Sequence, residues 1–408
     1  MRARRHRVAM SAKGSASTPV PQASAPEDIR NVVLVGHSGA GKTTLFEHLI
    51  AATTPDYRAK PVLDERSVQL AVACLAHEGL VLNLIDTPGY PDFVGELRAG
   101  LRAADAALFV ISAADGVDSA TMLLWEECAA IGMPRAVAVT KLDAGRADFE
   151  DTLAICQRVF GEGVMPLYLP LHAEDETIIG NLGLLSQQIY DYSSGQMVAK
   201  ASDATHRELI EGHRSDLIEA IIQESEDDTL LDRYLGGEEV DIDIVEADLL
   251  TAVSRGRFHP VIPVSTQTGV GTVELLHLLT AAFPPPTLHP LPAAMTPNGR
   301  PLSPLQCDPN GTLVAEVVRT TSDPYVGRVS VVRVFSRTLR PFSFFHVSLH
   351  LYPLPSFSPL PRPPLPPAHV PVLLLSSPLP HPFPPPAFPL LASLSLSPPL
   401  PLPLPPPP

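Results

Sequence analysis

Short runs of apolar residues alternate with stretches of helical periodicity between Asn31 and Phe283. The apolar runs that predict strands are residues 32–35, 81–85, 107–112, 136–139 and 261–264. The periodic stretches that predict helices are residues 43–52, 95–103, 120–131 and 273–283. Because the strand runs are apolar at successive positions, both faces of their sheet are expected to be covered. The pattern therefore predicts an α/β fold with a parallel sheet between helices.

The long interval between Asp143 and Val261 indicates an insertion, because a minimal domain of this pattern needs only one helix there. We expect the inserted subdomain at about residues 160–255. Within it, an apolar run predicts a strand at residues 164–169, and an acidic periodic stretch predicts a helix at residues 207–226.

The C-terminal part differs in composition from the rest of the chain. Three prolines, Pro284 to Pro286, end the last predicted helix, and two β-rich runs follow at residues 312–320 and 325–335. Beyond Val347 proline recurs every few residues, which favours a disordered polyproline-II-like tail. Docking to SH3- or WW-type partners and translation of a misread open frame are the two alternatives for this tail. The predicted segments are a disordered leader at 1–30, a first domain at 31–284, a linker at 285–305, a partial β-barrel at 306–347 and the tail at 348–408.

Charge and cysteine usage exclude several classes of protein. The formal net charge of −15 argues against direct DNA binding by a basic surface. The four cysteines have neither disulfide nor metal-ligand spacing, and this favours a reducing cytoplasm. No window holds 18 apolar residues without a breaker, so no membrane-spanning helix is expected. The first 26 residues hold four arginines and no acid, which leaves an organelle transit peptide open as the alternative to a cytoplasmic leader.

A glycine-rich loop with phosphate-binding spacing directly follows the first predicted strand. Its pattern is G-x-x-x-x-G-K-T, and the residues that we expect to contact nucleotide are Gly36, His37, Ser38, Gly39, Ala40, Gly41, Lys42, Thr43 and Thr44. Glycines let backbone N–H groups point at phosphate oxygens, and the following helix directs its positive end at them. Lys42 is expected to bridge the β- and γ-phosphates, and the Thr43 hydroxyl is expected to ligate Mg²⁺.

Two further loops follow predicted strands. The first is Asp86-Thr87-Pro88-Gly89, in which Asp86 is a candidate Mg²⁺ ligand and the Gly89 N–H a candidate γ-phosphate donor. The second is Thr140-Lys141-Leu142-Asp143. A carboxylate at Asp143 accepts the two N–H donors of guanine, whereas adenine would leave it facing an acceptor. The Lys141 stem is expected to lie along the base, and the Ser265 backbone N–H to meet the guanine carbonyl.

These motifs, in this order, resemble the translational GTPases, and the insertion after Asp143 narrows the resemblance to elongation factor G and its relatives. The stretches that carry it are IRNVVLVGHSGAGKTTL, LIDTPGYPDFVGELRAGLRAADAALFV and NGTLVAEVVRTTSDPYVGRVSVVRVFSRTLRP, within residues 29–347. The resemblance implies a P-loop NTPase fold, the Ras-like G domain with an inserted subdomain, followed by a partial β-barrel. It also implies GTP or GDP and Mg²⁺ as ligands and the ribosome as a partner.

The sequence departs from the family pattern at three positions. Tyr90 stands where most of these factors have the histidine that orients the attacking water, and a phenol is a poor proton acceptor near neutral pH. Gly39 replaces an aspartate of the phosphate loop. Gln69 aligns with a threonine that ligates Mg²⁺ in the family. The candidates to replace that ligand are Thr53, Thr54 and Ser67.

Three hypotheses follow for function. The first is a slow GTPase in which Lys42, Gly89 and Tyr90 form the catalytic set. The second is a ribosome-associated module that binds GTP with negligible hydrolysis. The third is a truncated or misread product without translocase activity.

Overall fold

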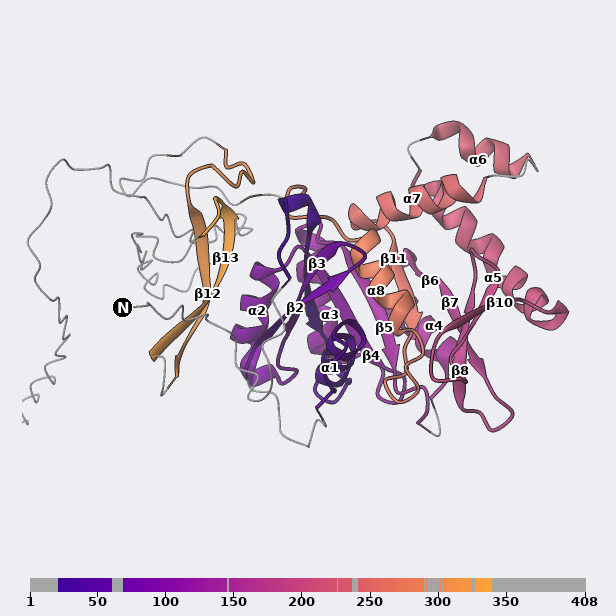
Figure 1. Cartoon of the computed structure of the whole chain (residues 1–408). Coiled ribbons are helices and arrows are strands. Elements are labelled where there is room, and N and C mark those ends of the chain that lie inside the picture. Colours follow the sequence, from indigo (N-terminus) through magenta and orange to yellow (C-terminus); the bar gives the residue numbers. More distant parts are fainter. Residues whose placement is uncertain are drawn as a thin grey trace, which may run out of the picture.

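The computed structural model describes residues 21–60, 69–144, 147–225, 227–236, 241–289, 291, 301, 304–323 and 327–339 (Figure 1). The predicted proline-rich tail lies outside the described residues, as do residues 1–20 of the predicted leader and most of the predicted linker. The rest of the predicted leader contains a short 3-10 helix, Pro26–Asp28. The first strand begins at Ile29, three residues before the predicted strand at 32–35.

A seven-stranded mixed sheet forms the centre of the first domain. Its order is β2-β3-β1-β4-β5-β11-β6. The strands are β1 (Ile29–Val35), β2 (Ala71–His77), β3 (Leu80–Asp86), β4 (Ala106–Ser112), β5 (Arg135–Thr140), β6 (Val164–Pro166) and β11 (His259–Pro263). All neighbouring pairs are parallel except β2 and β3. The five predicted strands are present, and β2 and β6 extend the sheet at its edges.

The edge strand β2 is the part of this sheet that the apolar pattern did not reveal. It joins β3 through the two-residue turn Glu78-Gly79, where both residues have positive φ, 48° and 80°. Such turns match the twist of antiparallel strands, and glycine adopts the second position without strain. Most of β2 is only half-buried. Residues 71–76 are apolar, but three of the six are alanine, a residue that is depleted in strands, so the run gave a weak strand signal.

Helices cover both faces of the sheet. They are α1 (Lys42–Thr53), α2 (Val94–Ala103), α3 (Ser119–Ala130), α4 (Phe149–Phe160) and α8 (Thr272–Ala281). Every residue of β4 is buried, which requires cover on both sides. Within the core, the Trp125 ring stacks on Phe160 with 4.2 Å between centroids and meets Phe109 edge-on at 4.8 Å. No helix among the described residues is long and apolar enough to span a membrane.

The insert forms a second, antiparallel sheet with the order β10-β9-β8-β7. Its elements are β7 (Tyr168–His172), β8 (Ile178–Gly183), β9 (Gln188–Asp191), β10 (Val198–Ala201), α5 (Ala204–Gln223), α6 (Asp228–Leu235) and α7 (Ile242–Ser254). The single strand expected at residues 164–169 is two strands in different sheets, because β6 pairs with β11 in the main sheet. The chain changes sheet at Leu167, whose N–H donates to Val261 O at 3.0 Å.

A two-stranded hairpin, β12 (Val314–Asp323) and β13 (Gly327–Ser336), lies beside α2 at the opposite end of the molecule from the insert helices (Figure 1). Polar side chains join it to the first domain. Arg333 donates to Asp105 Oδ1 at 2.6 Å and to Ala103 O at 3.0 Å. Arg102 of α2 donates to Glu316 of β12 at 2.9 Å.

Candidate nucleotide-binding site

The predicted phosphate loop connects β1 to the first turn of α1. Gly36 has φ +153°, and a Cβ on it would stand 2.3 Å from Val110 O of β4, so the close approach to β4 requires glycine. Gly41 adopts a left-handed conformation, φ +92°, as the residue before α1. The chain can therefore turn sharply enough for the N-terminal N–H groups of α1 to face the loop.

Lys42 lies inside this loop rather than in solvent. It is 5% exposed, and its Nζ donates to Gly36 O at 2.8 Å and to His37 O at 2.9 Å. Burial lowers the pKa of Lys42 to about 8, and the nearby carboxylate of Asp86 opposes this shift. The ammonium therefore carries its charge at neutral pH, as a group that binds phosphate must.

Thr43 and Asp86 come together at the carboxyl edge of the sheet. The Thr43 hydroxyl donates to Asp86 Oδ2 at 2.8 Å, and Asp86 is 1% exposed. Its other oxygen, Oδ1, is buried and has no hydrogen-bond partner in the described part of the chain. Burial raises the pKa of this carboxyl to about 6. A hydroxyl and a buried carboxylate with a free lone pair are the hard oxygen ligands that Mg²⁺ prefers, so these residues fit the ion.

The loop after β3 lies directly on the phosphate loop. The Thr87 hydroxyl donates to Leu34 O of β1 at 2.6 Å, which fixes the start of the loop. A Cβ on Gly89 would stand 2.5 Å from Lys42 Nζ and 2.6 Å from Ser38 N. Only glycine fits in this contact, and it brings the Gly89 backbone to the lysine that is expected to hold the γ-phosphate. Tyr90 follows directly and is half-buried.

The base-reading loop is joined to the phosphate loop by one side chain. The buried Thr140 hydroxyl contacts Ala40 O at 2.7 Å and Ile111 O at 3.2 Å. Lys141 adopts a left-handed conformation, φ +56°, and its Nζ lies 3.3 Å from Asp115 Oδ2. Asp143 is exposed at the end of this loop.

Two residues of the loop between β11 and α8 change the sequence-based picture. The Ser265 N–H donates to Val270 O at 3.0 Å, so it is already used inside the loop. The role expected for the Ser265 N–H at the guanine carbonyl stays a prediction, and the neighbouring N–H of Thr266 is a second candidate donor. Gln267 was not predicted, yet its Nε2 donates to Asp143 Oδ2 at 2.5 Å. Its long separation from Asp143 in sequence left no pattern by which to find it.

One of the candidates for a further Mg²⁺ ligand has its side chain engaged within its own helix. The Thr53 hydroxyl donates to Leu49 O and Ile50 O of its own helix, at 3.0 and 3.2 Å. Gln69 is exposed, and Ser67 lies outside the described residues.

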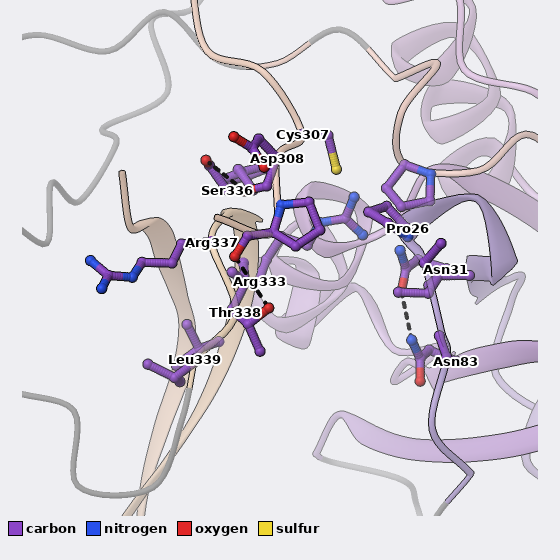
Figure 2. Close-up of a pocket in the computed structure, with 18 of the residues that line it drawn as sticks. Pro26, Asn31, Asn83, Cys307, Asp308, Arg333, Ser336, Arg337, Thr338 and Leu339 are labelled. Atoms are coloured by element: carbon purple, nitrogen blue, oxygen red, sulfur yellow. Dashed lines mark hydrogen bonds between the residues drawn. The ribbon is translucent and has the colours of Figure 1, made fainter. Parts of the chain in front are cut away.

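The cavity in Figure 2 is separate from these loops. It has a volume of about 650 Å³ and is lined by residues that include Asn31, Asn83, Cys307, Arg333 and Ser336. None of the predicted nucleotide-binding residues lines it. Two of these lining residues are joined by a hydrogen bond, from Asn83 Nδ2 to Asn31 Oδ1 at 2.9 Å (Figure 2).

Comparison with known proteins identifies the family of the first domain. The family model described as the elongation factor Tu GTP binding domain matches residues 27–285, more than half of the chain, and the chain belongs to this family. It is 53% identical over 352 residues to the elongation factor G-like protein of two Mycobacterium tuberculosis strains, a match that covers 83% of this chain and 48% of each relative. A solved structure from Thermus thermophilus matches with a TM-score of 0.67 and 33% identity, covering 78% of this chain and 47% of that one.

These findings confirm the predicted fold and the resemblance to elongation factor G-like proteins. The first domain is the GTP-binding domain of a translational GTPase, and the hairpin β12–β13 is an antiparallel β unit that follows it. The chain spans about half the length of the curated relatives it matches.

Proposed function

We propose that this chain binds GTP and GDP with Mg²⁺, hydrolyses GTP slowly and acts in contact with the ribosome in a cytoplasmic compartment. The observation that carries the nucleotide proposal is the Thr140 hydroxyl, which joins the base-reading loop to the phosphate loop through Ala40 O at 2.7 Å. The four free thiols support a reducing compartment. The ribosome enters through the likeness to elongation factor G-like proteins.

Guanine selectivity rests on Asp143. Its exposed carboxylate stands at the end of a strand whose last residue, Thr140, touches the phosphate loop. A base attached to phosphates in that loop meets the carboxylate, which accepts the N1–H and N2–H donors of guanine. Adenine offers an acceptor at the same place, and the resulting unpaired charge disfavours it.

Charge neutralisation at the phosphates rests on Lys42, Thr43 and Asp86. The first is a buried ammonium within the loop, and the other two are joined by a 2.8 Å hydrogen bond. In our proposal Thr43 and Asp86 hold Mg²⁺, which supplies positive charge to the β- and γ-phosphate oxygens. The Gly89 N–H donates to the γ-phosphate, because its backbone packs against Lys42 Nζ.

Slow hydrolysis rests on Tyr90, which follows Gly89 at the edge of the same loop. A phenol accepts a proton from water poorly near neutral pH, so positioning and charge stabilisation must act without an efficient base. The second candidate function is nucleotide-dependent ribosome binding with negligible hydrolysis. It is favoured by Thr53, whose hydroxyl is bonded within α1 and so is turned away from the Mg²⁺ position.

The test is a titration of the full chain with fluorescent GDP and GTP analogues and Mg²⁺, with ATP and xanthosine triphosphate as competitors. Wild type should bind guanine nucleotides that ATP does not displace, and phosphate release should be slow. Asp143→Asn should gain xanthosine triphosphate binding, because its amide donates to the additional carbonyl of xanthine. Displacement of the GTP analogue by ATP, or an unchanged preference in Asp143→Asn, would overturn the assignment. Co-sedimentation with ribosomes in the GTP state tests the partner.

A further inference from the structure

A buried polar cluster lies where the insert meets the loop between β11 and α8. We call Asn181, Tyr192 and Glu274 the junction cluster. Asn181 belongs to β8 and Tyr192 follows β9, so both come from the insert, whereas Glu274 belongs to the first turn of α8. Their exposed fractions are 0%, 7% and 5%.

Hydrogen bonds connect all three members. The Tyr192 hydroxyl donates to Glu274 Oε2 through a short contact. Asn181 Nδ2 lies 3.4 Å from Glu274 Oε1 and 3.5 Å from Pro263 O, the last residue of β11. Burial raises the pKa of Glu274, while the bonds from Tyr192 and Asn181 act in the opposite direction.

The cluster lies against the loop between β11 and α8. A Cβ on Gly269 would stand 4.0 Å from Tyr192 Cδ1, so the Tyr192 ring lies next to this loop. Gly271, with φ +78°, approaches so closely that a Cβ would stand 2.2 Å from Pro263 O. Between Pro263 and Gly271 lies Gln267, whose amide contacts Asp143. Asn181 therefore contacts the residue before this loop, and Glu274 belongs to the helix turn that follows it.

We propose that the junction cluster positions the guanine-reading loop, and that Tyr192 and Glu274 are positioning residues for base recognition. This inference rests on the proposed guanine site at Asp143. Glu274 fixes the first turn of α8, and Asn181 fixes the end of β11. The insert thereby sets the place of Thr266 and Gln267 relative to Asp143, although it is remote from that carboxylate in sequence.

Base recognition, rather than phosphate binding, is the property that should change when the cluster is altered. GDP and inosine diphosphate differ only in the 2-amino group, whose N–H is proposed to donate a hydrogen bond to the Asp143 carboxylate. In Tyr192→Phe the carboxyl of Glu274 loses its shortest bond, and the loop is held less firmly. We expect GDP to dissociate about tenfold faster and the preference for GDP over inosine diphosphate to fall by a similar factor.

Tyr190→Phe is the matched control. Tyr190 lies two residues earlier on β9, and its hydroxyl contacts Ser186 Oγ at 3.1 Å at an exposed position. This variant removes the same atom from the same segment without touching Glu274, so its dissociation rates should equal those of wild type.

Glu274→Leu removes both hydrogen bonds of the cluster at once. The buried Tyr192 hydroxyl and Asn181 amide then lose their acceptor, so the thermal midpoint should fall. GDP release should accelerate about tenfold, and the preference for GDP over inosine diphosphate should fall with it. A purely structural role predicts an unchanged preference for GDP over inosine diphosphate. Glu274→Gln keeps an acceptor for the Tyr192 hydroxyl and should restore most of the wild-type rate.

The experiment is stopped-flow release of a fluorescent GDP analogue, and of its inosine counterpart, from the full chain and the four variants. If wild type binds neither analogue, the proposed nucleotide site itself fails. If wild type binds with guanine preference but Tyr192→Phe and Glu274→Leu release GDP like Tyr190→Phe, the positioning role is wrong. Should Tyr192→Phe not fold, Glu274→Leu and Glu274→Gln decide the question alone.

Discussion

The ion pair between Arg333 and Asp105 should control the stability of the whole described unit. Arg333 is 8% exposed, Asp105 is 0% exposed, and Nη2 lies 2.6 Å from Oδ1. In Arg333→Met the carboxylate stays buried with two remaining neighbours. Asn31 Nδ2 donates to Oδ2 at 2.7 Å, and His289 Nδ1 lies 3.8 Å from Oδ1.

The expected loss follows from these contacts. Removal of one partner of a buried ion pair typically costs about 3–5 kcal/mol. Because Asn31 still compensates one carboxylate oxygen, we place Arg333→Met near the lower end, at about 3 kcal/mol. The double variant Arg333→Met/Asp105→Asn removes the uncompensated charge and should recover about 1–2 kcal/mol of this loss.

Urea unfolding followed through Trp125, the single tryptophan of the chain, measures this loss. Trp125 packs on Phe109 of β4, the strand that begins directly after Asp105, so its fluorescence reports on the affected region. The reasoning would be refuted if Arg333→Met lowered the free energy of unfolding by less than about 1 kcal/mol with an unchanged dependence on urea concentration. The pair would then behave as a solvated surface contact.

Three further predictions concern the nucleotide site. Gly89→Ala places a methyl group against Lys42 Nζ, so GTP affinity in equilibrium titration should fall by about tenfold or more; equal affinity contradicts the packing. Tyr90→His supplies a base and should raise ribosome-stimulated phosphate release by roughly 100-fold; an unchanged rate removes Tyr90 from the explanation of slow hydrolysis. Burial raises the pKa of Asp86 to about 6 from 3.8, so the folded state binds this proton more tightly than the unfolded chain. Stability without Mg²⁺ should therefore fall as pH rises from about 4 to 6, by about 3 kcal/mol, and Asp86→Asn should remove this dependence in urea unfolding.

The central strands and the three nucleotide loops were predictable because their signals are local. Apolar runs identified β1 and β3 to β5, and the loop motifs placed Thr43 and Asp86, which the structure brings into contact. The edge strand β2 was missed because its apolar run consists half of alanine, which gives little preference for a strand. The division between β6 and β7 was missed because one apolar run feeds two sheets.

The contacts between remote segments had no sequence signal. Gln267 meets Asp143 across an inserted subdomain, and the Tyr192 hydroxyl finds Glu274 only after that subdomain has folded. Ser265 was assigned a donor role from its place after a strand, but the loop closes on itself and uses that N–H for Val270 O. Such details depend on loop geometry, which neither spacing nor periodicity specifies.

The hydrogen bond from the Thr140 hydroxyl to Ala40 O fixes the distance between the phosphate loop and the base-reading loop before any ligand binds. A nucleotide that binds its phosphates first finds the base pocket already at the correct separation, so the second contact forms as an intramolecular event at high effective concentration. Guanosine and diphosphate supplied as separate molecules forgo that advantage. The combined affinities for guanosine and diphosphate should therefore be far lower than the affinity for GDP. In Thr140→Val, which lacks the hydroxyl, the difference between the two should be smaller.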